Sequence, residues 1–330
     1  MSNAKKWFDE MVQASLEVKI LSKRVNELER IVRRLDPGLQ KMQILVWRNI
    51  GGLGDILMQS PIARGLKEKF PEAIVTYAVP KQFTAIPEHN PYVDKVKEIT
   101  TPFFNNGYDH CIKLSEPCPC AVYESVRSPN IDRHRIDLFL EGAGVEPSSK
   151  DLIYTVKTDE REWAAKFLKK HGARDCFKVG FQLRSITPLR DWELANFKVL
   201  AKLIKKKFSG TKIFIFDADP KMAWQQKEVV DICGYSIPEV AAVMQTMDFM
   251  ICPDSGLAHL AGALKVPILG IFGPTDPKYR LSTYHKADWI YLSQKFDCMP
   301  CWYGQCHDLS CLKAITPEMV LRKMEAMLNG

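Results

Sequence analysis

Long apolar runs are missing from this chain. No stretch of its 330 residues approaches the about twenty uninterrupted apolar residues that a membrane-spanning helix needs. The first ten residues, MSNAKKWFDE, carry acidic side chains where a signal peptide would have its apolar region. We therefore expect a soluble cytoplasmic protein without a transmembrane segment, and a peripheral association with the inner membrane is the second option.

Clusters of basic and aromatic side chains are also missing. The formal net charge is +7, but the lysines are spread along the chain rather than gathered near aromatic residues. This distribution favours an anionic partner such as a nucleotide or a phosphorylated glycolipid, and it argues against a nucleic acid. The length and the apolar content suffice for two domain cores of ordinary size plus an extension.

Two common glycine signatures of nucleotide binding are absent, although a glycine-rich loop is present. The loop NIGGLG, residues 49–54, follows a short apolar strand at 44–47 and precedes a helix at 55–69. This order of elements is typical of phosphate binding. The loop lacks, however, the third glycine of the dinucleotide fingerprint and the Gly-Lys-Ser/Thr sequence of a P-loop.

The glycines of this loop can bring a second molecule close to the backbone. They are Gly51, Gly52 and Gly54, and none of them has a Cβ atom that would block the approach. Asp55 follows at the rim of the loop, with its carboxylate facing the same gap. On the local pattern alone, we favour a helix N-cap over a catalytic role for Asp55.

The run PDSGLAHLAGALKVPILGIFGPTDP, residues 253–277, combines a polar cluster, a helix start and a buried strand. Apolar residues at helical spacing follow Asp254, Ser255 and Gly256, so this polar trio is predicted to cap a helix. The first N–H groups of such a helix point outward and form an anion site, most often for a diphosphate. Taken alone, simple helix capping is equally favoured. The segment 266–273 is predicted to be a buried parallel strand.

A loop after another strand offers further groups for a phosphate. The loop RSITPLRDW, residues 184–192, contributes Thr187 and Arg190, and such groups can neutralise a pyrophosphate leaving group. Taken alone, a surface loop with solvated arginines is the favoured interpretation. Asp217 and Asp219, which follow the strand KIFIF, could accept hydrogen bonds from a ribose or an adenine, or could start the next helix.

Strands and helices alternate in two successive series. The first series contains strands at 44–47, 73–79, 93–99 and 108–114 and helices at 55–69 and 133–142. The second contains helices at 158–171, 193–207, 221–233 and 238–246 and strands at 177–183, 211–216 and 248–251. The pattern predicts an α/β fold of two doubly wound, Rossmann-like domains that face a cleft, over residues 37–155 and 156–330. The glycine-rich loop and the polar trio then lie at strand ends on opposite sides of that cleft.

Residues 4–35 form a separate segment with a heptad repeat. Two kinds of residue alternate in steps of three and four, namely Val18, Val25 and Val32 with Leu21, Leu28 and Leu35. Valine and leucine at the two core positions favour a parallel two-stranded coiled coil. We expect a coiled-coil helix over residues 1–36 that forms a homo-oligomer, rather than an amphipathic helix packed on its own chain.

Four of the ten cysteines are concentrated in one short loop, residues 298–311. They are Cys298, Cys301, Cys306 and Cys311. Four thiolates in one small loop suit a tetrahedral zinc or iron site, and a cytoplasmic setting disfavours disulfides. We therefore expect a structural metal here, and free or air-oxidised thiols are the alternative.

Taken together, these motifs resemble a known family. The runs GGLGDILMQSPIARGLKEKFP and PDSGLAHLAGALKVPILGIFGPTDP, with NPYVDKV and HRIDLFLEGAGVEP, are similar to the family 9 glycosyltransferases, the ADP-heptose:lipopolysaccharide heptosyltransferases and their relatives. The resemblance covers about residues 42–330. It implies a GT-B fold, an inverting transfer from a nucleotide diphosphate sugar, and no metal requirement for the chemistry.

The resemblance also implies roles for individual residues. Asp55 matches the catalytic base of the family, and Arg190 replaces a phosphate-binding lysine of many members. The matches to donor-binding positions are Thr187, Asp254, Ser255, Gly256 and His259, and Asp219 falls near the acidic residue that contacts the nucleoside. For His259, a core histidine bonded to a neighbouring carbonyl is equally favoured. Similar cysteine clusters occur in some relatives that modify proteins and carry iron.

The expected activity is an inverting glycosyl transfer, with a heptose from ADP-heptose as the expected sugar. The acceptor is a hydroxyl on a lipopolysaccharide core, another glycan or a protein. Two alternatives stay open: a sugar-nucleotide epimerase of the same fold, and a catalytically silent scaffold that binds nucleotide sugars. The acidic residue at Asp55 argues against the scaffold, because a silent subunit has no use for a carboxylate in the cleft.

Overall fold

The computed structural model describes most of the chain. The described residues are 24, 41–99, 107–115, 119–217, 229–301, 306 and 308–329. They belong to two units, Met1–Met42 and Gln43–Gly330. Within the segment 4–35 only Arg24 is described, and it is helical and exposed. The predicted coiled coil and its oligomer interface therefore lie outside the described residues.

Four parallel strands form the first sheet. In chain order they are β1 (Gln43–Trp47), β2 (Ile74–Val79), β3 (Lys95–Glu98) and β4 (His110–Lys113), and their order in the sheet is β3-β2-β1-β4. The apolar run of β1 is central, and Leu45 pairs with Thr76 of β2 and with Cys111 of β4. All four predicted strands of this half are present.

The helices of the first half differ from the prediction in three ways. They are α2 (Leu53–Met58), α3 (Ser60–Lys69), α4 (Ala85–Glu88), α5 (Pro119–Arg127) and α6 (Arg135–Ala143). The single helix predicted at 55–69 is interrupted at Gln59, because Pro61 has no N–H to continue the ladder. Helix α6 passes through Gly142 and ends at Gly144, whose φ of 65° is left-handed. Helices α4 and α5 were not predicted.

Six parallel strands form the second sheet. They are β5 (Lys178–Gln182), β6 (Lys212–Phe216), β7 (Val229–Asp231), β8 (Phe249–Pro253), β9 (Ile268–Phe272) and β10 (Ala287–Tyr291), in the order β10-β9-β8-β5-β6-β7. The helix predicted at 221–233 is wrong over its last residues, since β7 pairs with β6 there. The β-branched Val229 and Val230 fit a strand better than a helix. Residues 221–228 lie outside the described part.

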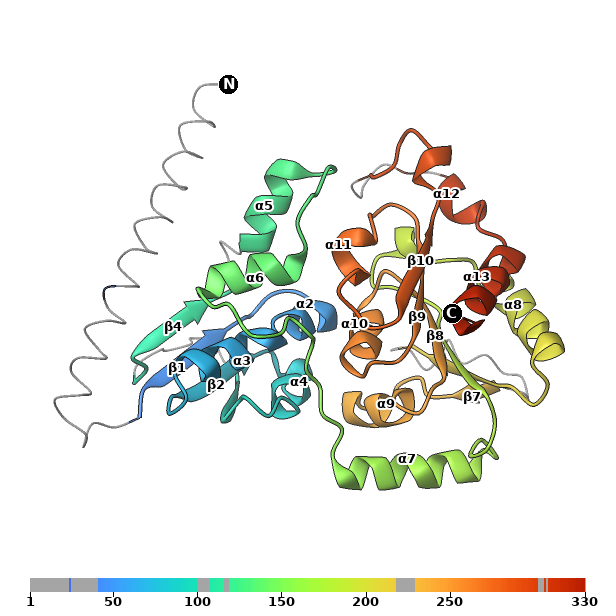
Figure 1. The fold of residues 1–330 in the computed structure, drawn as a ribbon. Coiled ribbons are helices and arrows are strands. Elements are labelled where there is room, and N and C mark those ends of the chain that lie inside the picture. Colours follow the sequence, from blue (N-terminus) through green and yellow to red (C-terminus); the bar gives the residue numbers. More distant parts are fainter. Residues whose placement is uncertain are drawn as a thin grey trace. The chain divides into compact units, whose positions relative to one another are not determined.

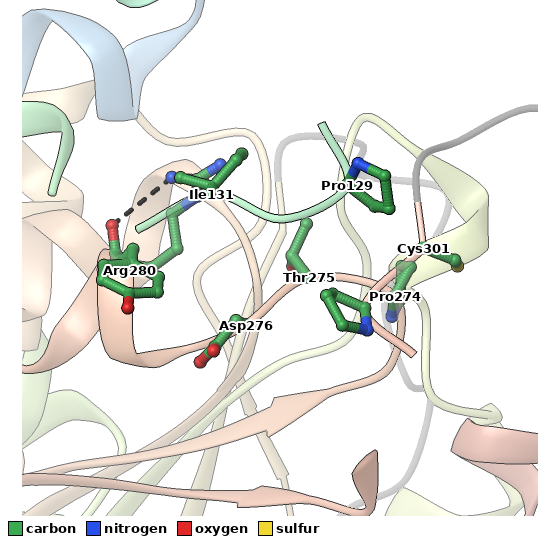
Figure 2. Close-up of a pocket in the computed structure, with 9 residues that line it drawn as sticks. Pro129, Ile131, Pro274, Thr275, Asp276, Arg280 and Cys301 are labelled. Atoms are coloured by element: carbon green, nitrogen blue, oxygen red, sulfur yellow. Dashed lines mark hydrogen bonds between the residues drawn. The ribbon is translucent and has the colours of Figure 1, made fainter. Parts of the chain in front are cut away.

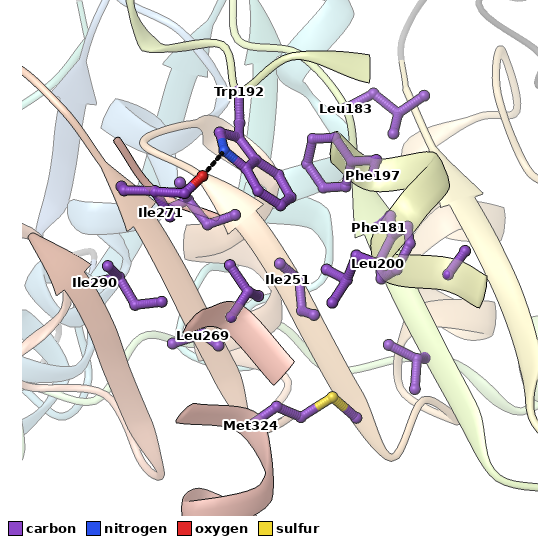
Figure 3. Close-up of a cluster of buried hydrophobic side chains, with 14 of the residues drawn as sticks. Phe181, Leu183, Trp192, Phe197, Leu200, Ile251, Leu269, Ile271, Ile290 and Met324 are labelled. Atoms are coloured by element: carbon purple, nitrogen blue, oxygen red, sulfur yellow. Dashed lines mark hydrogen bonds between the residues drawn. The ribbon is translucent and has the colours of Figure 1, made fainter. Parts of the chain in front are cut away.

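Helices precede and follow the strands of this second half (Figure 1). They are α7 (Thr158–Lys170), α8 (Leu194–Lys207), α9 (Ile237–Met244), α10 (Gly256–Ala263), α11 (Lys278–Leu281), α12 (Ser310–Lys313) and α13 (Pro317–Asn329). Helices α8, α12 and α13 supply side chains to the core of the second sheet. Figure 3 shows Trp192 among Phe181, Phe197 and Ile271, with its indole N–H donating to the Ile315 carbonyl at 2.9 Å. Helix α13, which was not predicted, adds the fully buried Met324.

The loops that were singled out in the sequence lie at carboxyl ends of strands. The glycine-rich loop follows β1, the loop 184–192 follows β5, and Asp254 follows β8. In the sequence, the strands of the first sheet precede the predicted boundary at 155/156, and those of the second sheet follow it. The region Gln43–Gly330 nevertheless forms one compact unit. No helix in the described ranges is long and apolar enough to cross a membrane.

Candidate active site

Helix starts from the two halves meet at this site. Helix α2, which follows the glycine-rich loop, packs against α10, which follows the polar trio (Figure 1). A Cβ atom at Gly54 would lie 2.4 Å from Cδ2 of His259, and one at Gly256 would lie 2.8 Å from Cβ of Leu53. These two glycines therefore allow one half of the chain to approach the other. The sequence predicted that Gly54 brings a second molecule close to the backbone. In the structure, the His259 side chain of the same chain occupies the space beside Gly54.

The other two glycines of the loop have different surroundings. Gly51 has a φ of +93°, and a Cβ there would lie 2.6 Å from Oδ2 of Asp55. Both the backbone conformation and the lack of space require glycine at this position. Beside Gly52, the nearest atom that a Cβ would meet is Cδ1 of Ile186, at 3.8 Å. Gly52 is thus the glycine of this loop with space beside it for a ligand.

Asp55 lies three residues beyond the N-cap of α2, so it is not the N-cap that the local pattern favoured. Gly52 occupies the N-cap position, and its N–H donates to Oδ2 of Asp55 at 3.0 Å. Oδ1 accepts a hydrogen bond from Arg135 at 2.8 Å and lies 3.9 Å from Arg48. Burial by itself would raise the pKa of Asp55, but the two guanidinium groups and the Gly52 N–H outweigh it. The pKa therefore lies below its ordinary value, and the carboxylate is ionised at neutral pH.

The guanidinium beside Asp55 is itself held by a buried carboxylate. Arg135, the first residue of α6, donates to both oxygens of Glu124 on α5, at 2.6 and 2.5 Å. Glu124 also pairs with Arg280 of α11 at 3.3 Å. No motif in the sequence assigned a role to these three residues. Arg135 lies within the run HRIDLFLEGAGVEP, but no local pattern pairs it with residues 80 positions away.

Asp254 and Ser255, which precede α10, do not cap the helix through their side chains. Ser255 occupies the N-cap position, but its hydroxyl donates to the side-chain oxygen of Gln182. Asp254 is buried and accepts a hydrogen bond from Thr275 at 2.7 Å. No side chain in the described part of the chain caps the first N–H groups of α10. These groups thus have the orientation that suits an anion, at the positive end of the helix.

Arg190 lies beside that helix start. Its guanidinium is 3.1 Å from Oδ2 of Asp254 and donates to the Asp254 carbonyl at 3.3 Å. Burial would raise the pKa of Asp254, but Arg190, Arg280 and the Thr275 hydroxyl lower it below its ordinary value. Thr187 belongs to the same loop, at the start of the short 3₁₀ turn η2 (Pro188–Arg190). Asp219 lies outside the described residues.

His259 is a core histidine at the contact between α2 and α10. Its Nδ1 lies 2.5 Å from the Tyr284 hydroxyl, so the hydrogen bond to a backbone carbonyl that was considered is not the one observed. Burial lowers the pKa of His259 to about 4, although Asp254 and Asp55 oppose this effect. The ring is therefore neutral at neutral pH.

A recess next to these charges is lined by both halves of the chain. It is partly open to solvent. Figure 2 shows Pro129 and Ile131, from the loop between α5 and α6, opposite Thr275 and Arg280. Cys301 lies at one end of the recess.

The four cysteines of the loop 298–311 are close enough to affect one another. Burial raises the pKa of Cys301 and of Cys311, and the other thiols of the loop raise both further. The Cys306 sulfur accepts a hydrogen bond from the Leu309 N–H at 3.4 Å. Within the described ranges, however, no three His, Cys, Asp or Glu side chains are placed to hold a metal ion. The zinc or iron site in this loop therefore stays a prediction.

Comparison with known families identifies one that matches this chain. The sequence model of glycosyltransferase family 9 (heptosyltransferase) matches residues 125–311, which is more than half of the chain. This chain belongs to glycosyltransferase family 9. The lipopolysaccharide heptosyltransferase 1 of Pseudomonas aeruginosa is 32% identical over 109 residues, which make up 28% of this chain and 30% of the relative. The chain thus matches less than a third of that relative's length.

Solved structures share the fold over most of the chain. A family 9 glycosyl transferase from Veillonella parvula has a TM-score of 0.71 at 20% identity and covers 88% of this chain and 98% of its own. The iron-containing dodecameric glycosyltransferase TibC from enterotoxigenic Escherichia coli has a TM-score of 0.64 at 13% identity, over 88% of this chain and 77% of its own. TibC has also been solved in complex with ADP-D-beta-D-heptose. The predicted α/β class with two parallel sheets of the GT-B type is confirmed.

Proposed function

We propose that this chain transfers a heptose from ADP-heptose to a hydroxyl group of a lipopolysaccharide core, with inversion at the anomeric carbon. The observation that carries the proposal is the meeting of two unlike helix starts. One presents an ionised carboxylate, Asp55, and the other presents uncapped N–H groups beside Arg190. Family membership and the printed names of the Pseudomonas relative and of TibC supply the sugar, the nucleotide and the acceptor class.

The acceptor side of the reaction belongs to Asp55. As the acceptor oxygen forms its bond to the anomeric carbon, its proton passes to the carboxylate. Asp55 is a weak base, because its pKa lies below the ordinary value. A weak base suffices if the hydroxyl becomes acidic only while the new bond forms. The open space beside Gly52 is where the hydroxyl would approach.

The donor side belongs to the start of α10 and to Arg190. The bond between the anomeric carbon and the diphosphate oxygen breaks, and ADP leaves with the electron pair. The N–H groups of α10 and the Arg190 guanidinium would neutralise the charge that develops on it. Asp254 fixes Arg190 at 3.1 Å and so keeps the guanidinium at the helix start. Thr187 and Ser255 would add hydroxyl contacts, and Asp219 would contact the nucleoside.

Product analysis with ADP-heptose and a lipopolysaccharide core oligosaccharide tests this function. We expect ADP and a heptosylated core of inverted anomeric configuration, and an about 100-fold lower kcat for Asp55→Asn. Asp137→Asn is the matched control, because Asp137 pairs with Lys150 on the surface of α6. A changed sugar without acceptor would indicate an epimerase, and binding without any turnover would indicate a scaffold.

Two sequence predictions remain proposals beside this function. A structural zinc or iron in the loop 298–311 is supported by the mutual effect of its thiols and by the printed description of TibC as iron-containing. Metal analysis of the purified protein tests it, with about one metal per chain expected. Self-association through residues 4–35 is supported by the heptads alone.

A further inference from the structure

A row of buried and partly buried charges links Asp55 to the donor half of the chain. Arg135 bonds Asp55 at 2.8 Å and Glu124 at 2.6 and 2.5 Å, and Glu124 pairs with Arg280 at 3.3 Å. The exposed fractions of the Glu124 and Arg280 side chains are only 5% and 4%. Arg280 in turn helps to lower the pKa of Asp254, the partner of Arg190. Negative and positive groups thus alternate from the carboxylate to the phosphate-binding side.

A row of this kind is not explained by stability alone. Removing charges from water costs several kcal/mol per ion, and apolar residues of similar volume often serve stability equally well. What the row does provide is a fixed geometry. Two of the three nitrogens of Arg135 are committed to Glu124, so only Nη1 faces Asp55.

We propose that Arg135 and Glu124 are positioning residues. Arg135 fixes the orientation of the Asp55 carboxylate and keeps it ionised. Glu124 holds the Arg135 side chain in place and also contacts Arg280 of the donor half. This inference rests on the proposed role of Asp55 as the base. Neither Arg135 nor Glu124 needs to touch a substrate. Their effect reaches the reaction through the orientation and the ionisation of Asp55.

The other groups around Asp55 do not replace Arg135 in fixing the carboxylate. Arg48 is the second guanidinium, but it lies 3.9 Å away and is committed to the carbonyls of Ile50 and Leu114. His259, from α10, is neutral at neutral pH, because burial lowers its pKa to about 4, and the Gly52 N–H fixes Oδ2. Because Oδ1 accepts a hydrogen bond from Arg135 and Oδ2 accepts one from the Gly52 N–H, the carboxylate cannot rotate freely.

Four variants of the full-length protein test the inference: Arg135→Met, Arg135→Lys, Glu124→Gln and the control Arg133→Met. Arg133 lies two residues before the start of α6, and it pairs with Glu141 on the surface, with 43% of its side chain exposed. The first readout is a pH titration of the Asp55 carboxyl carbon by ¹³C NMR without substrate, assigned with Asp55→Asn. The second is kcat, its pH profile and the ADP affinity with ADP-heptose and core oligosaccharide.

These variants should separate the effect of the Arg135 charge from the effect of its position. Arg135→Met removes the positive neighbour, so Asp55 should titrate at higher pH, the acid limb of kcat should move the same way, and kcat should fall about tenfold. Glu124→Gln should lower kcat by a similar factor without raising the titration midpoint, because the charge of Arg135 remains. Arg135→Lys should restore the midpoint but not kcat. ADP affinity should stay within about twofold throughout.

The outcomes distinguish failure of this inference from failure of the proposed function. If Arg135→Met matches Arg133→Met in both titration and turnover, Arg135 does not position Asp55. If the midpoint moves in Arg135→Met while Asp55→Asn keeps normal turnover, Arg135 controls the carboxylate but Asp55 is not the base. If Arg135→Met fails to fold, unchanged kcat in both Arg135→Lys and Glu124→Gln overturns the inference.

Discussion

The starts of α2 and α10 follow the same local plan and carry opposite electrostatic character. Each follows a parallel strand and a short loop, and each has a small residue, Gly52 or Ser255, at its N-cap. At α2 the chain supplies its own anion, since Asp55 accepts the Gly52 N–H. At α10 the Ser255 hydroxyl and the Asp254 carboxylate bond elsewhere, to Gln182 and Thr275.

In the proposed function, this difference gives the two helix starts separate roles. A helix start that already holds a carboxylate has little attraction for a second anion, and that carboxylate can receive a proton. A helix start without a side-chain cap is ready for an anion. The same strand-loop-helix pattern can therefore serve the acceptor in one half and the diphosphate in the other.

The largest change in stability that we expect concerns the buried histidines next to these helix starts. Burial lowers the pKa values of His259 and His134 to about 4, from 6.5 in the unfolded chain. A depressed pKa stabilises the fold above the unfolded value, and this stability is lost as the pH falls from 6.5 towards 4. Each histidine could contribute up to about 3 kcal/mol to this loss. His134 also caps α6 as an acceptor from the Ile136 N–H at 3.2 Å, which requires a neutral ring.

Urea unfolding between pH 7 and pH 4 measures this loss. The free energy of unfolding should fall more steeply in the parent than in His259→Gln, and the exposed His285→Gln should resemble the parent. Equal slopes for all three proteins would mean that His259 is not the titrating group.

A smaller effect should distinguish two glycines of the same loop. Gly54→Ala places a methyl group 2.4 Å from the His259 ring and should lower the free energy of unfolding by about 1–3 kcal/mol. Gly52→Ala, with 3.8 Å to the nearest atom, should leave it nearly unchanged. Thermal unfolding of the two variants checks the difference, and equal destabilisation would contradict the packing of α2 on α10.

The sequence predicts those features of the two helix starts that depend on neighbouring residues. It does not predict contacts between residues that lie far apart in the chain. Apolar runs placed β1, β5 and β8, and glycines and small polar residues marked both helix starts. The partners of those residues were not predictable, because Arg135 reaches Asp55 across 80 positions and Arg280 reaches Glu124 across 156. Helix α5, which carries Glu124, was not predicted either. The side-chain partners of Asp254 and Ser255 were not predictable for the same reason. Thr275 and Gln182 lie at or after the ends of other strands.

The N-terminal heptads should have the smallest effect on the site. Deleting residues 1–36 should reduce the molar mass from that of a dimer to that of a monomer, because Val and Leu at the core positions favour two strands. Both helix starts lie beyond this segment, so ADP affinity should be retained. Light scattering measures the mass, and an unchanged oligomer after deletion would place the interface elsewhere.

One pair of variants tests the division of work between the two helix starts most directly. Isothermal titration with ADP and steady-state kinetics are measured on Asp55→Asn and on Arg190→Ala. We predict that Asp55→Asn loses about 100-fold in kcat and keeps its ADP affinity, whereas Arg190→Ala weakens ADP binding by about tenfold, as expected for a lost charged hydrogen bond. If Asp55→Asn weakened ADP binding as much as Arg190→Ala did, or Arg190→Ala bound ADP normally, the two helix starts would not have separate roles.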